Sequence, residues 1–325
     1  MRRGWVAVAV AFGFAGCIFD MDVDLGSFRS GGAFQETVVR GDDGPKIALL
    51  EVSGVITDSP RSGAFSLGTL PSPIAELREA LERAGADDEV AALVLRIESP
   101  GGTVSASETL YHEVSRWKER SQRPVVAYFN GLATSGAYYT AMAADEILAH
   151  PTAVTGSIGV VMSGFNFAGL MERFGVSAQT FTSGPYKDSG SPFRKMRPDE
   201  QEYLQEVIDD FYERFVEVVD LGRPGLERAG VVALADGRIY TARQALNAGL
   251  VDEIGYLEDA IDRAREAAHI QGEVRVVAYH RSGSPHDNIY SRTSTPEPAV
   301  AIDLLPRGLD LPAGFYYLWL PGIGD

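Results

Sequence analysis

PVVAYFNGLATSGAYY, residues 124–139, is the stretch of the sequence on which the fold depends. Residues 125–129 form an apolar run with the length and β-branched content of a buried strand, and the small residues of 137–144 continue at helical spacing. Ser135 therefore falls in the first turn of a helix, where unpaired N–H groups and the helix dipole would stabilise an alkoxide or a tetrahedral oxyanion. The alternative is that Thr134 or Ser135 only caps the helix.

The segments before this stretch repeat the same order of strand and helix. We expect strands at residues 46–56, 90–97 and 125–129, with helices from Ser72 to Gly85 and over residues 105–120 between them. This order predicts an α/β fold with right-handed crossovers, in which sites lie beyond the carboxyl ends of the strands. Gly101, Gly102 and Ser135 all follow such ends, so we expect them to face one crevice.

The rest of the chain predicts shorter elements and a tail. We expect strands at residues 146–150, 156–161, 177–181, 250–254 and 274–279, helices at 167–174, 198–221, 243–248 and 257–268, and a loop at 182–192. The long helix at 198–221 is expected to pack on the domain or on another subunit. Residues 46–280 then form one domain. Residues 281–325 are expected to form a Pro/Gly-rich tail, whose apolar patches at 299–305 and 315–320 dock on the domain or on a neighbouring subunit.

A serine hydroxyl is a poor nucleophile unless a neighbouring group removes its proton. None of the five histidines lies in a loop with glycine and polar neighbours, so each is expected to be structural or solvated. The other candidate base is lysine, because arginine stays protonated. The sequence has four lysines: Lys46 begins a strand, Lys118 lies on a solvated helix and Lys195 stands among arginines. Lys187, in a loop rich in glycine, proline and serine, is the best candidate, and its alternative role is an ion pair with Asp188.

Ser135 and Lys187 could act together as a dyad. A neutral amine would accept the Ser135 proton while the hydroxyl attacks a carbonyl, and would then donate that proton to the leaving amine. Backbone N–H groups of Gly101, Gly102 and Gly136 are the candidate oxyanion hole, because glycine has no side chain to block close approach. Loss of one such donor typically costs roughly 10²- to 10³-fold in rate.

The N-terminus favours export and membrane attachment. A basic segment, Met1-Arg2-Arg3, precedes an apolar run at 4–14, which is too short to span about 30 Å of hydrocarbon. Cys17, the only cysteine, follows Ala15-Gly16 in a segment that resembles the bacterial lipobox, whose cysteine is diacylated. The alternatives are a core cysteine or an uncleaved membrane anchor. Residues 18–45 are acidic and glycine-rich and are expected to form a flexible tether. The formal charge of −16 argues against nucleic acid as a partner.

Five segments form an ordered set: SPGG at residues 99–102, TSGAYY at 134–139, GSIGV at 156–160, YKD at 186–188 and GRIYTARQA at 237–245. Together they resemble the signature segments of the signal peptide peptidase A family, which are Ser–Lys peptidases on the ClpP/crotonase fold. The resemblance covers residues 46–264. It implies an α/β fold of repeated ββα units with a helical oligomerisation segment, Ser135 as the nucleophile, Lys187 as the general base, and no cofactor.

The resemblance also implies a biological setting. It points to a membrane-associated endopeptidase that digests remnant signal peptides on the exported side of the bacterial cell membrane. With its single domain, this chain is similar to the short-chain members of the family. In those members, subunits form a ring and each site takes its serine and lysine from adjacent subunits. The N-terminus departs from the family, which commonly has a transmembrane anchor. Two alternatives are a crotonase-type acyl-CoA enzyme, disfavoured by export and by the presence of both Ser135 and Lys187, and an inactive scaffold lipoprotein.

Overall fold

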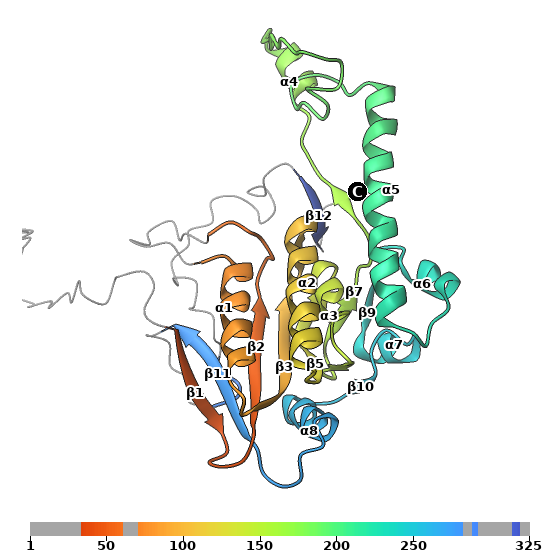
Figure 1. The fold of residues 1–325 in the computed structure, drawn as a ribbon. Helices are drawn as coiled ribbons and strands as arrows, with labels where there is room; N and C mark the ends of the chain where they lie inside the picture. The colour runs from red at the N-terminus through yellow and green to blue at the C-terminus, as the bar shows by residue number, and fades with distance from the viewer. Residues whose placement is uncertain (1–33, 61–70, 282–287, 292–313, 319–325) are drawn as a thin grey trace, which may run out of the picture.

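A nine-stranded sheet forms the centre of the computed structural model, which describes residues 34–60, 71–281, 288–291 and 314–318. Its strands run in the order β1-β11-β2-β3-β5-β6-β10, while β7 (Val154–Gly156) pairs with β5 and β9 (Ile239–Thr241) pairs with β7 (Figure 1). The bounds along the main path are β1 (Phe34–Arg40), β2 (Lys46–Ser53), β3 (Val90–Ser99), β5 (Val125–Thr134), β6 (Glu146–Ala149), β10 (Glu253–Ile254) and β11 (Arg275–Arg281). Neighbours from β11 to β10 are parallel, whereas β1 is antiparallel to β11.

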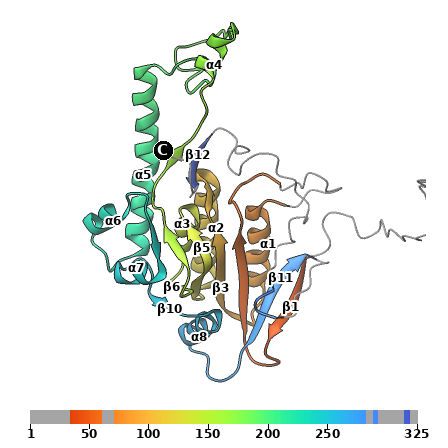
Figure 2. The same ribbon diagram turned by 180° about the vertical axis from the view of Figure 1, so that it is seen from behind.

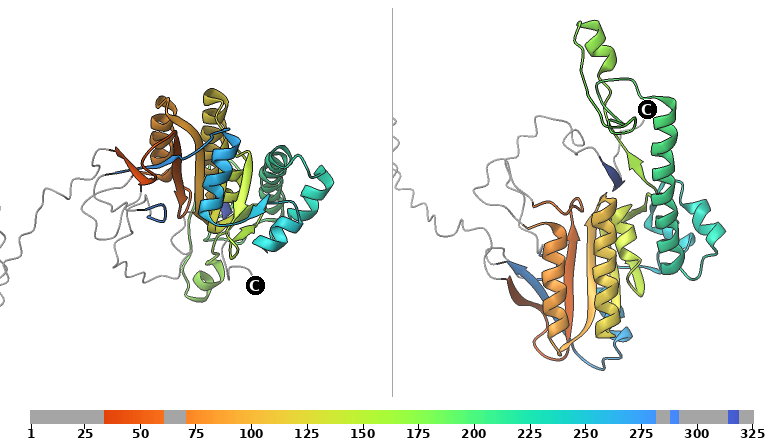
Figure 3. Two further views of the ribbon diagram at one scale, coloured as in Figure 1. Left: turned by 90° about the horizontal axis from the view of Figure 1, so that it is seen from below. Right: turned by 45° about the horizontal axis from the view of Figure 1, so that its top comes forward.

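Helices cover both faces of this sheet. One layer contains α1 (Pro73–Ala86), α2 (Val104–Ser121) and α3 (Gly136–Ala141), and Figure 3 shows α1 and α2 side by side across the strands. The opposite layer is α8 (Leu257–Ala267). Successive residues of a strand point to opposite faces, so Leu93 packs beneath the first layer while Val94 packs beneath α8. This arrangement confirms the predicted α/β class.

The structure contains the first helix and the first three strands that the sequence predicted. The Ser72 hydroxyl accepts a hydrogen bond from the Ala75 N–H at 3.2 Å, and Pro73 is the first residue of α1, so serine caps this helix as expected. The predicted strands at 46–56 and 90–97 are β2 and β3. The predicted third strand extends to Thr134, directly before Ser135.

An arm, residues 163–197, projects from the sheet. It begins after β8 (Val161–Met162), contains α4 (Ala168–Arg173) and leads into α5 (Pro198–Gly222). Figures 1 and 2 show that α4 and the N-terminal half of α5 extend beyond the main sheet. The C-terminal half of α5 is anchored in the core by four buried side chains, Phe215, Val216, Val218 and Val219. No helix in the described part of the chain combines the length and the apolar character needed to cross a bilayer.

A second, three-stranded sheet lies at the carboxyl edge of the main one. It contains β4 (Gly101–Thr103), β12 (Phe315–Leu318) and β8, in the order β4-β12-β8, and β12 is antiparallel to both neighbours. The predicted docking of the 315–320 patch on the domain is therefore confirmed for the residues of β12. The other predicted patch, 299–305, lies outside the described residues.

Three expectations need correction. Residues 34–40 of the predicted tether form β1, because the buried side chains of Phe34 and Val39 are held against β11. No strand forms at 177–181, where Phe181 is 95 % exposed, because β-type residues need a partner strand that the arm does not provide there. The expected strand at 156–161 is interrupted by positive φ angles at Gly156 and Ser157, which leave β7 (Val154–Gly156) and β8 as separate strands.

The C-terminal part of the domain holds short elements. Helices α6 (Arg228–Leu234) and α7 (Ala242–Asn247) and strand β9 (Ile239–Thr241) follow α5. The helices expected at 243–248 and 257–268 match α7 and α8, whereas α6 and β9 were not predicted. Strand β9 pairs with β7 and so closes the sheet beside the turn that carries Ser135.

Candidate active site

Ser135 lies at the junction between β5 and α3 in a strained backbone conformation. Its φ of 55° and ψ of −118° lie in a region that non-glycine residues rarely adopt. Two backbone hydrogen bonds hold it there: its N–H donates to the Gly156 carbonyl at 2.7 Å, and its carbonyl accepts from the Tyr139 N–H at 2.9 Å. The Ser135 side chain makes no capping bond to α3, so the simpler interpretation as an N-cap is wrong.

The predicted glycines meet next to this turn. A Cβ atom built on Gly101, whose φ is +101°, would come within 2.8 Å of the Gly136 nitrogen. One built on Gly136 would come within 2.1 Å of the Ser107 Oγ, and one on Gly102 within 1.8 Å of the Ile56 carbonyl oxygen. Only glycine fits these three positions, and the structure brings all three backbones to the N-terminus of α3.

The three glycines differ in what their N–H groups can do. The Gly101 N–H donates to the Ser99 hydroxyl at 3.1 Å, so this donor is already engaged. Gly136 is the first residue of α3, and a first-turn N–H has no acceptor within its own helix. This leaves Gly136, and Gly102, whose backbone is paired with Tyr317 of β12, as the candidate oxyanion donors, while Gly101 has the positive φ of the turn that precedes Gly102.

Lys187 lies in the arm, and its side chain is exposed. The alternative that it forms an ion pair with Asp188 is wrong, because Arg194 donates to both oxygens of that carboxylate, from Nε at 2.8 Å and from Nη2 at 2.7 Å. Among the described residues, Lys187 forms no ion pair with an acidic side chain.

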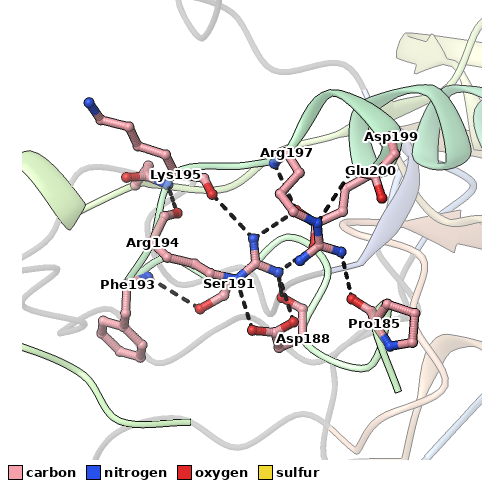
Figure 4. A network of polar contacts seen from close by, with 10 residues as sticks. Pro185, Asp188, Ser191, Phe193, Arg194, Lys195, Arg197, Asp199 and Glu200 are labelled. Atoms are coloured by element: carbon pink, nitrogen blue, oxygen red, sulfur yellow. Dashed lines mark hydrogen bonds and ion pairs between the residues drawn. The ribbon is translucent and has the colours of Figure 1, made fainter.

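A buried carboxylate fixes the loop that carries Lys187 (Figure 4). Glu200, in the first turn of α5, is fully buried and accepts from Arg194 Nη1 at 2.7 Å and from the Arg197 N–H at 2.9 Å. Arg197 Nη2 donates to the Pro185 carbonyl at 2.6 Å. Hydrogen bonds from Arg194 lower the pKa of Glu200 to about 2. The network ties the loop to the start of α5 and gives it a fixed shape.

Within one protomer, Ser135 and the Lys187 loop are tied to different points along α5. The ring of Tyr139, one turn beyond Ser135, packs against Phe215 of α5 with ring centroids 5.0 Å apart. Glu200 precedes Phe215 in the same helix, and at about 1.5 Å per residue this spacing corresponds to roughly 22 Å. Because the Lys187 loop is tied to Glu200, no hydrogen bond joins the Lys187 amine to the Ser135 hydroxyl in the described structure.

The remaining candidate bases are engaged elsewhere or exposed. The hydrogen bonds that Lys46 donates to Asp87 and Glu36 raise its pKa and keep it protonated, and Lys118 pairs with Asp145 at 3.2 Å. The Lys195 side chain points away from the network in Figure 4. His150 contacts Thr152 and His280 contacts Thr37. In the described part of the chain neither His112 nor His269 bonds to Ser135, and His286 and Cys17 lie outside that part.

Sequence reasoning did not find two parts of this region. One is the Arg194–Glu200 network, although glutamate at the third position of a helix is a known capping signal and could have indicated it. The other is a set of aromatic rings beside Ser135, in which Tyr139 stacks on Tyr317 of β12. No local pattern relates these two residues, because they are far apart in the sequence.

A serine on a strained strand-to-helix turn, beside closely packed glycine backbones, is an arrangement typical of serine-dependent acyl-transfer enzymes of α/β architecture. Comparison with known proteins identifies the family. Residues 118–271 match the model of Peptidase family S49. A putative signal peptide peptidase SppA from Enterococcus faecium is 36% identical over 82% of this chain and 81% of its own length. A putative protease from Synechocystis, slr0021, is 41% identical over 66% of this chain and 72% of its own length.

The chain belongs to peptidase family S49 and is a serine peptidase, as the resemblance to the signal peptide peptidase A family implied. Among solved structures, a mutant of ClpP1 from Listeria monocytogenes matches 66% of this chain and 94% of its own chain, with a TM-score of 0.43 and 14% sequence identity.

Proposed function

We propose that this peptidase cleaves peptide bonds with Ser135 as the nucleophile and Lys187 as the base, each contributed by a different copy of the chain. The observation that carries the proposal is the separation of the two residues. The loop that carries Lys187 is tied to Glu200, roughly 22 Å along α5 from Phe215, which packs on Tyr139 beside Ser135. We therefore assign this base to the serine of a neighbouring subunit.

Exposed apolar side chains on the arm support this assembly. Large hydrophobic residues face solvent there at Phe165, Phe167, Leu170, Phe174, Val176 and Phe181. Phe174 is 73 % exposed and Phe181 is 95 % exposed. Monomeric soluble proteins rarely leave such a group uncovered. A head-to-tail contact in which the arm of one copy covers the next copy would close into a ring.

The proposed reaction passes through an acyl-enzyme on Ser135. The neutral Lys187 amine takes the proton from the Ser135 hydroxyl as its oxygen bonds to the substrate carbonyl carbon. The N–H groups of Gly102 and Gly136 hold the oxyanion that forms. The resulting ammonium gives its proton to the departing amine, and the acyl group stays on Ser135. Water, deprotonated by the same amine, then attacks the ester and releases the acid.

We place this activity at the exported side of a bacterial membrane. The basis is the N-terminal sequence, with its basic start, its apolar run and Cys17 as a diacylated anchor. The name of the Enterococcus faecium relative, a putative signal peptide peptidase, points to remnant signal peptides as substrates. Such peptides remain in the membrane after secretion, where an anchored peptidase meets them.

Complementation between inactive variants tests the shared site. Ser135→Ala and Lys187→Ala are each expected to be inactive on casein. When the two are co-expressed, random assembly should give active sites with both residues intact at about a quarter of positions. Lys195→Ala, a lysine in the same arm, is the matched control and should retain activity. Inactivity of the co-expressed pair, with normal native mass, would show that both residues must come from one chain. Equal background cleavage by all variants would support the inactive scaffold.

A further inference from the structure

The C-terminal strand β12 lies between two short strands, β4 and β8, at the active-site edge of the described structure. Tyr317 is paired with Gly102 of β4, and Tyr316 is paired with both Thr103 of β4 and Val161 of β8. Without β12, β4 and β8 would each present unpaired backbone N–H and C=O groups toward the other. Two such edges form a template for an extended peptide, which would add as a third strand.

The backbone of Tyr317 lies against the glycines of the oxyanion hole. Its carbonyl oxygen is 2.1 Å from a Cβ built on Gly101 and 3.0 Å from one built on Gly136. The peptide bond between Tyr317 and Leu318 therefore crosses the N-terminus of α3, where Ser135 is located. A substrate bond must take this position to place its carbonyl oxygen beside the donors.

The Tyr317 ring fills an aromatic pocket. It is fully buried, with centroid distances of 5.2 Å to Tyr139 and 4.7 Å to Phe215. Its hydroxyl donates to the Phe211 carbonyl at 2.7 Å, so the one polar atom of the side chain is satisfied. Such a pocket favours a flat ring that ends in a hydroxyl group.

Hydrogen bonds on the far side of this pocket fix the ring of Tyr139. The Tyr139 hydroxyl donates to the Glu108 carboxylate, which also accepts from Arg214 of α5 at 2.9 Å. Burial raises the pKa of Tyr139, so the hydroxyl stays protonated and keeps donating. The ring of Phe315, two residues before Tyr317 and on the same side of the strand, contacts Phe211 with ring centroids 5.3 Å apart.

We propose that β12 occupies the groove in which this peptidase binds its substrates, and that the groove takes an extended peptide with an aromatic residue immediately before the scissile bond. Tyr317 marks that residue, and Phe315 marks a second aromatic position two residues earlier. The inference rests on the proposed function, because it uses Ser135 to define the scissile bond. It follows that the chain's own tail competes with substrate and lowers the activity of the full-length protein.

Two matched peptides and one truncation test this proposal. Fluorogenic hexapeptides AGFYYL and AGFYAL differ only at the residue that corresponds to Tyr317. A variant that ends at Gly314 lacks β12. The truncated protein should cleave the tyrosine peptide roughly 10- to 100-fold more efficiently, in kcat/KM, than the alanine peptide. It should also exceed the full-length protein on the tyrosine peptide by about tenfold, because a tethered strand competes at millimolar effective concentration.

Point variants address the case in which the truncated protein does not fold. In the full-length chain, Tyr317→Ala should raise cleavage of the tyrosine peptide, whereas Tyr317→Phe, which keeps the ring, should raise it much less. Equal cleavage of both peptides, together with no gain from the truncation or from Tyr317→Ala, would overturn the inference. Labelling of Ser135 by a fluorophosphonate distinguishes failure of this inference from failure of the proposed function. If Ser135 is labelled but cleavage shows no aromatic preference, only this inference is contradicted. If the protein is neither labelled nor able to cleave either peptide, the proposed function is contradicted.

Discussion

Arg194 holds the Asp188 carboxylate through two hydrogen bonds, from Nε at 2.8 Å and from Nη2 at 2.7 Å. This pair matters because Lys187 is the residue next to Asp188. If the carboxylate were bonded to Lys187, the amine would remain charged and could not act as a base. Arg194 takes that place instead, and its pKa is raised further by Asp188 and Glu200.

Replacing Lys187 with arginine should abolish activity although the charge is kept. Arginine stays protonated at any pH at which the protein is folded, so it cannot take the Ser135 proton. We expect a drop in kcat of roughly 10²- to 10⁴-fold, the range for loss of a general base. Lys195→Arg, made in the same arm, should keep wild-type turnover. Substantial cleavage by Lys187→Arg would identify a different base.

Glu200→Gln should loosen the loop that carries Lys187. The amide cannot satisfy Arg194 and Arg197 together as the buried carboxylate does, and both guanidinium groups lose their counter-charge. Amide hydrogen exchange over residues 185–192 should speed up, and kcat should fall while KM changes little. The matched control is Asp199→Asn, because Asp199 is exposed and its ion pair is with Arg197. Equal exchange in both variants would remove Glu200 as a positioning residue for Lys187.

The same carboxylate predicts how the arm responds to acid. The ordinary pKa of glutamate is 4.5, and the folded arm lowers the value for Glu200 to about 2. A depressed pKa stabilises the folded form above pH 4.5, and this contribution is lost as the pH falls toward 2. Proteolysis by pepsin within residues 185–197 should therefore increase steadily between pH 4.5 and pH 2. In Glu200→Gln the rate of this cleavage should be high already at pH 4.5. A wild-type cleavage rate that does not change between pH 4.5 and pH 2 would contradict the stabilising role of Glu200.

Cys17→Ser should release the protein from membranes. The change removes the only thiol that could be diacylated, and the apolar run at residues 4–14 is too short to span a bilayer. Fractionation of cells that express either form, with detection by antibody, measures the outcome. Membrane association of Cys17→Ser at the wild-type level would indicate an uncleaved N-terminal anchor.

Features of this fold that depend on neighbouring residues could be predicted from the sequence. The turn at Ser135 could be predicted because a β-branched run, a serine and a glycine stand next to one another, and the capped start of α1 could be predicted from Ser72-Pro73. Strand β1 was missed because its alternation lies within an acidic, glycine-rich segment, and its stability comes from a strand more than 200 residues away. The place of Tyr317 depends on the same kind of long-range pairing. Such pairings follow from the shape of the assembled sheet, which no window of sequence contains.

Gly102→Ala tests the proposed role of the glycine backbone beside Ser135. In Gly102→Ala, the new methyl group would meet the Ile56 carbonyl, since a Cβ there lies 1.8 Å from that oxygen, and backbone has little freedom to move. Overpacking of this kind costs about 1 to 3 kcal/mol of stability. It should also displace the Gly102 N–H and reduce kcat by roughly 10²- to 10³-fold. Gly159→Ala is the control, because its nearest neighbour, the Gly237 Cα, is 3.7 Å away at an ordinary contact distance. Thermal unfolding and peptide cleavage should separate the two variants, and normal kcat in a folded Gly102→Ala protein would show that the oxyanion is held by other donors.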